Sequence, residues 1–159
     1  MEKIKVKAVN ISNNPLPEYK TPLSAGADLR AFVNGSGTKM VSEAFVQGDK
    51  IVIWPMGRCK IDTGLHIQLP DGYEAQVRPR SGLTLQNGII CILGTVDADY
   101  TGSIGIIIIN LSKDKFVIND GDRIAQLVIK RVEQAEFELV DKLDETERGN
   151  NGFGHTGTK

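Results

Sequence analysis

Hydrophobic and polar residues alternate along short stretches over much of the chain, which is the period of a half-buried β-strand. Two other stretches, residues 88–93 and 104–109, are continuously apolar, so we expect strands that are covered on both faces. A last strand is expected over residues 135–140. The stretches with clear alternation are residues 4–9, 50–54, 65–69, 73–78 and 123–129.

Turn residues separate these stretches. Pro70, Asp71 and Gly72 stand between two of the predicted strands. Proline presets φ, aspartate accepts local hydrogen bonds, and glycine takes the left-handed conformation. Residues 81–86 leave room for a helical turn or two, with Ser81 as the candidate N-cap. Many short strands joined by such turns predict an all-β, jelly-roll-like distorted barrel with one short helix.

The 159 residues are enough for one domain with a single core. The apolar pattern ends near residue 140, so we expect a β-barrel domain over residues 1–140 and a flexible C-terminal arm over residues 141–159. From Arg148 onward the arm contains four glycines and one aromatic residue, Phe153. It has no apolar run to bury, but its amides, hydroxyls, guanidinium and ring suit a polyphosphate and a stacked base. We interpret the arm as a lid.

Charge and composition exclude several classes of function. The net charge of −1 and the pI of about 6.1 give no electrostatic footprint for nucleic-acid binding. No apolar run approaches the ~20 residues of a membrane span, and the N-terminus lacks an apolar signal core. Cys59, Cys91, His66 and His155 do not have the spacing of a zinc site. We therefore expect a soluble, intracellular (cytoplasmic) protein with no nucleic-acid or membrane partner.

Two segments are candidates for binding an anion and activating water. Arg80 can supply a bidentate phosphate contact, while Ser81 and Gly82 let an anion approach their amides. The alternative is a plain N-cap beside a solvated arginine. Asp97, between two apolar strands, can hold and deprotonate a water molecule, with Tyr100 as a flat wall beside it. The alternative for Asp97 is a turn in which the carboxylate bonds to its own backbone.

Two further segments are weaker when each is taken alone. Gly26 permits a turn or bulge before Asp28, which begins a strand and is usually a turn cap in such a position. Gly121 and Asp122 indicate a β-turn, and Gln126 follows in a strand with an unassigned face.

In this order and at these separations, the segments resemble the five motifs of the trimeric dUTPase family. The resemblance covers about residues 20–158. The combination is specific, because chance agreement with one motif does not predict the next. The matching segments are Ala25-Gly26-Ala27-Asp28-Leu29, Pro79-Arg80-Ser81-Gly82-Leu83, Gly94-Thr95-Val96-Asp97-Ala98-Asp99-Tyr100-Thr101-Gly102, Gly121-Asp122-Arg123-Ile124-Ala125-Gln126-Leu127 and residues 148–157.

This resemblance implies a homotrimer of jelly-roll-like subunits with three active sites at the subunit interfaces. The family hydrolyses dUTP to dUMP and pyrophosphate, with Mg²⁺ on the triphosphate. The reaction keeps uracil out of DNA and supplies dUMP for thymidylate synthesis. Since water attacks, no nucleophilic side chain is required, and the sequence suggests none.

The resemblance also implies roles by position. Asp97 is implied to be the general base, and Tyr100 to pack under the deoxyribose and exclude a 2′-hydroxyl. Asp28 is implied to reach the metal only through water. The other implied substrate contacts come from the uracil-reading hairpin (Cys91, Thr95, Val96, Gly105), the phosphate contacts (Arg80, Ser81, Gly82, Gln126) and the arm (Arg148, Phe153 over the uracil ring, Gly154, His155, Thr156). Cys91 stands where some relatives have asparagine, and His155 where many have serine.

Two other functions are alternatives to dUTP hydrolysis. The related dCTP deaminases use an arginine and a glutamate where this chain has Leu85 and Ile107. An aliphatic side chain cannot carry out the glutamate's proton transfer, so we do not expect deamination. The second alternative is a non-catalytic module that only binds a nucleotide or a partner. Asp97, Tyr100 and Arg80 together with the complete arm favour an active enzyme.

Overall fold

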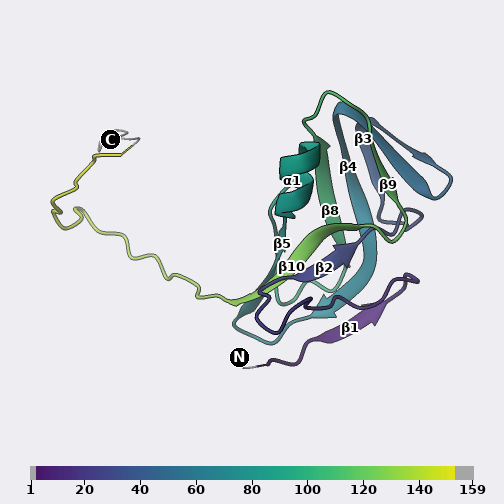
Figure 1. Ribbon diagram of the computed structural model, residues 1–159. Coiled ribbons are helices and arrows are strands. Elements are labelled where there is room, and N and C mark those ends of the chain that lie inside the picture. The colour runs from purple at the N-terminus through teal and green to yellow at the C-terminus, as the bar shows by residue number, and fades with distance from the viewer. Residues whose placement is uncertain (1–2, 153–159) are drawn as a thin grey trace.

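The computed structural model describes residues 3–152, which form two antiparallel sheets and one short helix (Figure 1). One sheet has six strands, in the order β1-β4-β8-β6 with β3 and β9 also paired to β4; the other has four, in the order β2-β10-β5-β7. The elements are β1 (Lys7–Asn10), β2 (Ala27–Arg30), β3 (Lys39–Gln47), β4 (Lys50–Gln68), β5 (Tyr73–Arg78), α1 (Ser81–Asn87), β6 (Ile89–Cys91), β7 (Gly94–Val96), β8 (Ser103–Asn110), β9 (Phe116–Asn119) and β10 (Arg123–Arg131).

The expected all-β architecture with one short helix is confirmed, although the two sheets of the described residues do not close into a barrel. Both sheets contribute to one hydrophobic core. Ile61 of β4 and Ile106 of β8 meet Leu29 of β2 in this core, and each is at most 1% exposed. Fully burying one such side chain contributes about 1.5–3 kcal/mol. The core therefore fixes the four-stranded sheet, which carries most of the candidate site, against the larger sheet.

Strand β4 is continuous for 19 residues, where the sequence predicted two separate strands over residues 50–54 and 65–69. Two positions with positive φ interrupt its alternation, Met56 at +62° and Gly64 at +65°. The pairing with β8 shifts between Asp62 and His66, which marks a bulge. Because of these irregularities, strict alternation of apolar and polar residues does not predict β4 as one continuous strand.

Strand β8 is buried on one face only, so the expectation that residues 104–109 are covered on both faces is wrong for a single chain. Ile104, Ile106 and Ile108 face the core and are at most 1% exposed, whereas Ile107 is 42% exposed. Successive side chains of a strand point to opposite faces, and this chain covers only one of them. The Ile107 side chain is therefore left open on the outer face of β8.

Helix α1 follows β5 and confirms the helical turn predicted for residues 81–86. Arg80, not Ser81, occupies the N-cap position, and it makes no side-chain cap hydrogen bond. Gly88 ends the helix in the left-handed conformation, at φ +64°. Among residues 3–152, no helix is long and apolar enough to cross a lipid bilayer.

The chain beyond β10 leaves the two sheets. The last sheet-like contact is the bond from the Val132 amide to the Gly72 carbonyl, at 3.0 Å. Residues 133–152 then run away from the body without forming a strand (Figure 1, yellow-green), so the strand predicted over residues 135–140 is wrong for the single chain. The whole segment from residue 133 to the C-terminus is called the arm below. Phe137 and Leu139 are 94% and 101% exposed. An extended segment without a sheet edge beside it has no partner for its backbone, which explains the missing strand.

Candidate active site

The four-stranded sheet brings three of the candidate segments to one place. Strand β10 lies between β2 and β5, and Gln126 of β10 is opposite Asp28 on one side and Arg78 on the other. Arg80 follows two residues after Arg78, at the start of α1. Residues that are about 50 and 100 positions apart in sequence are therefore neighbours at this end of the sheet.

Asp28 and two arginines form the charged centre of this cluster. Arg123 Nη1 lies 2.9 Å from Asp28 Oδ2, and Arg80 Nε lies 3.4 Å from Asp28 Oδ1. Arg80 Nη1 also donates a hydrogen bond to the Arg123 carbonyl, at 2.7 Å. Each oxygen of the carboxylate thus faces a guanidinium, and Arg80 is held at two points.

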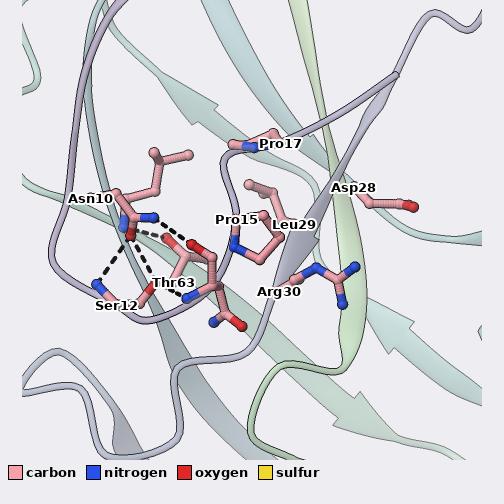
Figure 2. A pocket seen from close by; sticks show the side chains of 10 residues that line it. Asn10, Ser12, Pro15, Pro17, Asp28, Leu29, Arg30 and Thr63 are labelled. Atoms are coloured by element: carbon pink, nitrogen blue, oxygen red, sulfur yellow. Dashed lines mark hydrogen bonds between the residues drawn. The ribbon is translucent and has the colours of Figure 1, made fainter. Parts of the chain in front are cut away.

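Asp28 lies beside a small hollow that Figure 2 shows from close by. Asp28 and Arg30, two residues apart on β2, point their charged ends away from the hydrogen-bonded turn of Asn10 and Ser12. In that turn, the Ser12 amide and hydroxyl both donate to Asn10 Oδ1, at 3.0 and 2.7 Å. The hollow, of about 10 Å³, has room for no more than a water-sized group, so the charged cluster on the other side of Asp28 is the candidate site.

Gln126 is fixed against the Arg80 segment and against Gly26. Its Nε2 donates to the Pro79 carbonyl at 2.9 Å. A Cβ added to Gly26 would lie 2.3 Å from Gln126 Oε1, so glycine at this position lets the Gln126 side chain keep its place. The Gly26–Asp28 segment, which indicated little by itself in the sequence, is explained by the packing of Gly26 against Gln126 in the tertiary structure.

Arg123 is the residue of this cluster that sequence analysis missed. Strict alternation places Arg123 and Gln126 on opposite faces of their strand. The pairing of β10 with β2 shifts between Arg123 and Ala125, so this alternation does not hold there. The residues around Arg123 contain no local signal for this shift, because it arises from the pairing of β10 with β2.

Asp97 and Tyr100 lie in the exposed loop between β7 and β8. The Tyr100 amide donates to the Asp97 carbonyl at 3.2 Å, and the Tyr100 hydroxyl donates to the Ser103 carbonyl at 3.0 Å. A Cβ at Gly102 would lie 2.5 Å from the Tyr100 hydroxyl, so glycine allows the ring to fold over the loop. The Asp97 carboxylate has no hydrogen bond or ion pair with any residue that the structure describes.

The predicted uracil-reading hairpin is assembled from β6, β7 and β8. Thr95 is exposed and Val96 is buried on β7, while Gly105 on β8 lies against the Lys60 side chain. The Cys91 side chain is 4% exposed and belongs to the core. Burial raises the pKa of the Cys91 thiol to about 11, so it is protonated at neutral pH. Only the Cys91 backbone is available to a ligand.

The structure does not bring Asp97 and Arg80 together within one chain. Val96, next to Asp97, is opposite Ala75, whereas Arg80 comes after Arg78. The three-residue rise from Ala75 to Arg78 is about 10 Å, and both groups lie beyond its ends. The candidate base and the candidate phosphate residues are therefore at opposite ends of β5.

The arm is described only as far as residue 152. Arg148 is exposed, and its Nε donates to the Asn151 carbonyl at 2.9 Å. The predicted contacts of Phe153, Gly154, His155 and Thr156 lie outside the described residues.

A metal would find few direct ligands here. Within residues 3–152, no group of three or more His, Cys, Asp or Glu side chains is placed to hold an ion. Asp28 is already paired with two arginines. These described residues therefore do not form a protein cage for a cation.

Comparison with known proteins identifies the family of the chain. The dUTPase family model matches residues 45–157. The chain is 46% identical to a deoxyuridine 5′-triphosphate nucleotidohydrolase of Finegoldia magna, over 97% of this chain and 99% of the relative. It is 45% identical to the protein of the same name from Anaplasma marginale, over 98% and 99%. The fold is similar to that of the Staphylococcus bacteriophage 80alpha dUTPase with dUpNHpp, with a TM-score of 0.82 and 23% identity over 98% of this chain and 100% of that one. On the family match and these full-length relatives, the chain belongs to the dUTPase family.

Proposed function

We propose that this enzyme hydrolyses dUTP to dUMP and pyrophosphate, with Asp97 as the base and with active sites shared between the subunits of a homotrimer. The observation that carries the proposal is the identity of 45–46%, over nearly the whole chain, to relatives named as dUTP nucleotidohydrolases. The arrangement of Asp97, Tyr100, Arg80 and Gln126 supports it. The reaction belongs in the cytoplasm, where nucleotides are made.

Asp97 is suited to accept a proton from the attacking water. Its side chain is exposed and has no described partner, so the carboxylate is available to a water molecule. A carboxylate placed beside the scissile phosphate can take a proton from the attacking water and so act as a general base. Water attack leaves no covalent intermediate, which agrees with the buried and protonated state of Cys91.

Arg80, Ser81, Gly82 and Gln126 hold the phosphates in this proposal, and Arg148 joins them from the arm. Arg80 is oriented in advance by Asp28 and by the Arg123 carbonyl. Ser81 and Gly82 are exposed, and a Cβ at Gly82 would meet nothing within 4 Å in the chain. Nothing in a single chain requires glycine there, so its small size serves the approach of a group from outside.

Mg²⁺ arrives on the triphosphate and neutralises part of its charge. Asp28 is the carboxylate nearest the phosphate residues, and it reaches the ion only through water, because both its oxygens face arginines. A structure of a dUTPase from phage phi11 of S. aureus is described with a structural Mg(II) ion, at 22% identity to this chain.

Uracil and the deoxyribose are recognised beside Asp97. The hairpin backbone at Cys91, Thr95, Val96 and Gly105 contacts uracil. The Tyr100 ring, fixed by its hydroxyl, lies under the deoxyribose and leaves no room for a 2′-hydroxyl. From the arm, Phe153 covers the uracil ring, while Gly154, His155 and Thr156 add contacts to the phosphates.

Several features support a trimer. Asp97 and Arg80 lie at opposite ends of β5 within one chain, so a complete site needs a second copy. Ile107 presents an apolar face on β8 that one chain leaves open. The arm exposes Phe137 and Leu139 far from its own body.

A groove along β10 suits the arm of a neighbouring copy. Its apolar lining matches the exposed apolar side chains of the arm, and its lysines match the four acidic residues in the first part of the arm, over residues 133–141. The lining includes Ile4, Val6, Ile67, Ile129, Lys20 and Lys130.

Pyrophosphate release from dUTP, dCTP, dTTP and UTP, measured side by side with Mg²⁺, tests the proposed function. We expect rapid release from dUTP and little from the other three. Equal release from several nucleotides, or ammonia released from dCTP, would refute the assignment.

A further inference from the structure

The bulge in β4 lies directly beside the loop that carries Asp97 and Tyr100. Asp62 pairs with Gly105 and His66 with Ser103, so β4 takes four steps where β8 takes two. A bulge bends its strand and redirects the side chains around it. Here it turns side chains from both of its ends toward the first residues of β8.

Asp62 is a buried charge at one end of this bulge. It is 1% exposed, and its carboxylate accepts hydrogen bonds from the Gly37 amide at 2.9 Å, the Gly64 amide at 3.0 Å and the Ser103 hydroxyl. Burial alone would raise the pKa of Asp62, but the hydrogen bonds from Ser103, Gly64, Gly37 and Thr63 outweigh burial and lower it below the ordinary value. Asp62 is therefore ionised at neutral pH, which a buried carboxylate tolerates only when it is fully hydrogen-bonded.

The loop before β3 is shaped around the same carboxylate. Cβ atoms added to Gly35 or Gly37 would lie 2.7 Å from Asp62 Oδ2. The Asp62 backbone is also tied to this loop, because its amide donates a hydrogen bond to the Thr38 hydroxyl oxygen at 3.0 Å. Three separate parts of the chain thus converge on one side chain.

Three hydrogen bonds connect the bulge to the Asp97 loop. The Ser103 hydroxyl bonds to Asp62, and the Ser103 carbonyl receives the Tyr100 hydroxyl at 3.0 Å. His66 Nδ1 lies 2.9 Å from the Thr101 carbonyl. Tyr100 is therefore linked through Ser103 to the buried Asp62 carboxylate, and His66 holds the same loop at a second point.

We propose that Asp62, acting through Ser103 and assisted by His66, holds the Asp97–Gly102 loop in place and thereby sets the discrimination against ribonucleotides. The inference rests on the proposed function, in which Tyr100 lies under the sugar. Asp62 is a positioning residue, because it is buried and reaches the loop only through Ser103. Small displacements of a positioned group cost much of its effect on rate and selection.

Ser103→Ala tests this link without removing the buried carboxylate, which keeps its two glycine amides. We expect the ratio of kcat/KM for dUTP to that for UTP to fall about fivefold, the typical effect of one hydrogen bond. Ser103→Thr keeps the hydroxyl and is expected to keep the parent ratio. Ser112→Ala is the matched control, because the Ser112 hydroxyl bonds to Asn110 and Asp114 beyond the other end of β8.

Hydrogen exchange of the amides of residues 98–103 in the substrate-free enzyme supplies a second measurement that does not depend on activity. We expect faster exchange in Ser103→Ala and in His66→Ala, and no change in Ser112→Ala. An unchanged ratio, or unchanged exchange, in Ser103→Ala would overturn the proposal.

The two hypotheses fail in different ways. If the parent enzyme does not prefer dUTP to UTP, the proposed role of Tyr100 is wrong, and with it the inferred effect on selection. If the parent prefers dUTP and Ser103→Ala retains the whole preference, only the positioning role of Asp62 is wrong.

Discussion

Asp28 shows how one carboxylate can orient a binding residue without adding much stability. Its two ion pairs join a side chain that is 16% exposed to arginines that are 30% and 39% exposed, so solvent screens them. Pairs of this kind contribute about 0–1 kcal/mol to stability. In the proposed site, their effect is to place the Arg80 guanidinium before substrate arrives, since Arg80 and Arg123 would otherwise repel each other at this end of β5.

Asp97→Asn is expected to reduce kcat for dUTP by about 10²–10⁴-fold, because the amide keeps the shape of the side chain but cannot accept a proton. Binding of a non-hydrolysable dUTP analogue is expected to be nearly unchanged. Steady-state kinetics and isothermal titration measure the two effects. Asp99→Asn is the matched control in the same exposed loop and should retain activity. Turnover by Asp97→Asn close to the parent rate would show that Asp97 is not the base.

Tyr100→Ala is expected to raise kcat/KM for UTP relative to dUTP, because removal of the ring opens the space that a 2′-hydroxyl needs. Tyr100→Phe keeps the ring and loses only the bond to the Ser103 carbonyl, so its change should be smaller. Competition between the two nucleotides gives the ratio directly. A ratio that is the same in the parent and in Tyr100→Ala contradicts a steric role.

At the scale of elements, β4 and the arm behave in opposite ways. Strand β4 pairs with β1, β3, β8 and β9, so its backbone is bonded along most of its length in spite of two irregular positions. The arm, residues 133–152, has fewer apolar side chains than β4 and no sheet edge beside it in one chain. The two segments therefore differ both in their apolar content and in the partners available to their backbones.

Deleting residues 148–159 is expected to leave a folded protein with little dUTP hydrolysis. The deleted part contributes no core residue in the described region but supplies Arg148 and, by resemblance, Phe153 and Thr156. Thermal unfolding shows whether the shortened protein is still folded, and steady-state kinetics measure the loss of dUTP hydrolysis. Deleting only residues 158–159 is the control and should change neither thermal unfolding nor dUTP hydrolysis.

The stacking contribution of the arm is separable from its phosphate contacts. Phe153→Ala is expected to cost about 1–3 kcal/mol of binding to a dUTP analogue, the value of one base–aromatic contact. Full kcat/KM for dUTP in the enzyme that lacks residues 148–159 would show that the arm is not a lid.

At the scale of the whole molecule, one chain leaves several apolar side chains open to solvent. Ile107 on β8 and Phe137 and Leu139 of the arm are exposed, and the candidate base and the candidate phosphate residues are separated. Burying such surfaces between copies gains free energy in proportion to the apolar area removed from water. The same assembly would close the catalytic site.

Sedimentation is expected to give a trimer of the 17.3 kDa chain. Ile107→Lys places a charge on the open apolar face of β8 and is expected to weaken association, because a buried unpaired charge is costly. Activity should fall together with the trimer fraction as the protein is diluted. A fully active monomer would contradict shared sites.

The sequence by itself determined the features that depend on local chemistry and on linear order. The turn before β5, the strand over residues 123–129 and the helical turn at residues 81–86 follow from neighbouring residues, and the structure contains all three. The order of the five segments was enough to indicate the family. These features need no knowledge of which strands pair.

The tertiary structure decided everything that depends on strand register. It merged residues 50–54 and 65–69 into β4, directed the Cys91 side chain into the core, and brought Arg123 to Asp28. It also placed Asp97 and Arg80 at opposite ends of β5. Register and bulges arise from pairing between distant segments, and a shift of one residue turns every side chain to the other face. The alternation of apolar and polar residues along the sequence therefore does not predict such shifts.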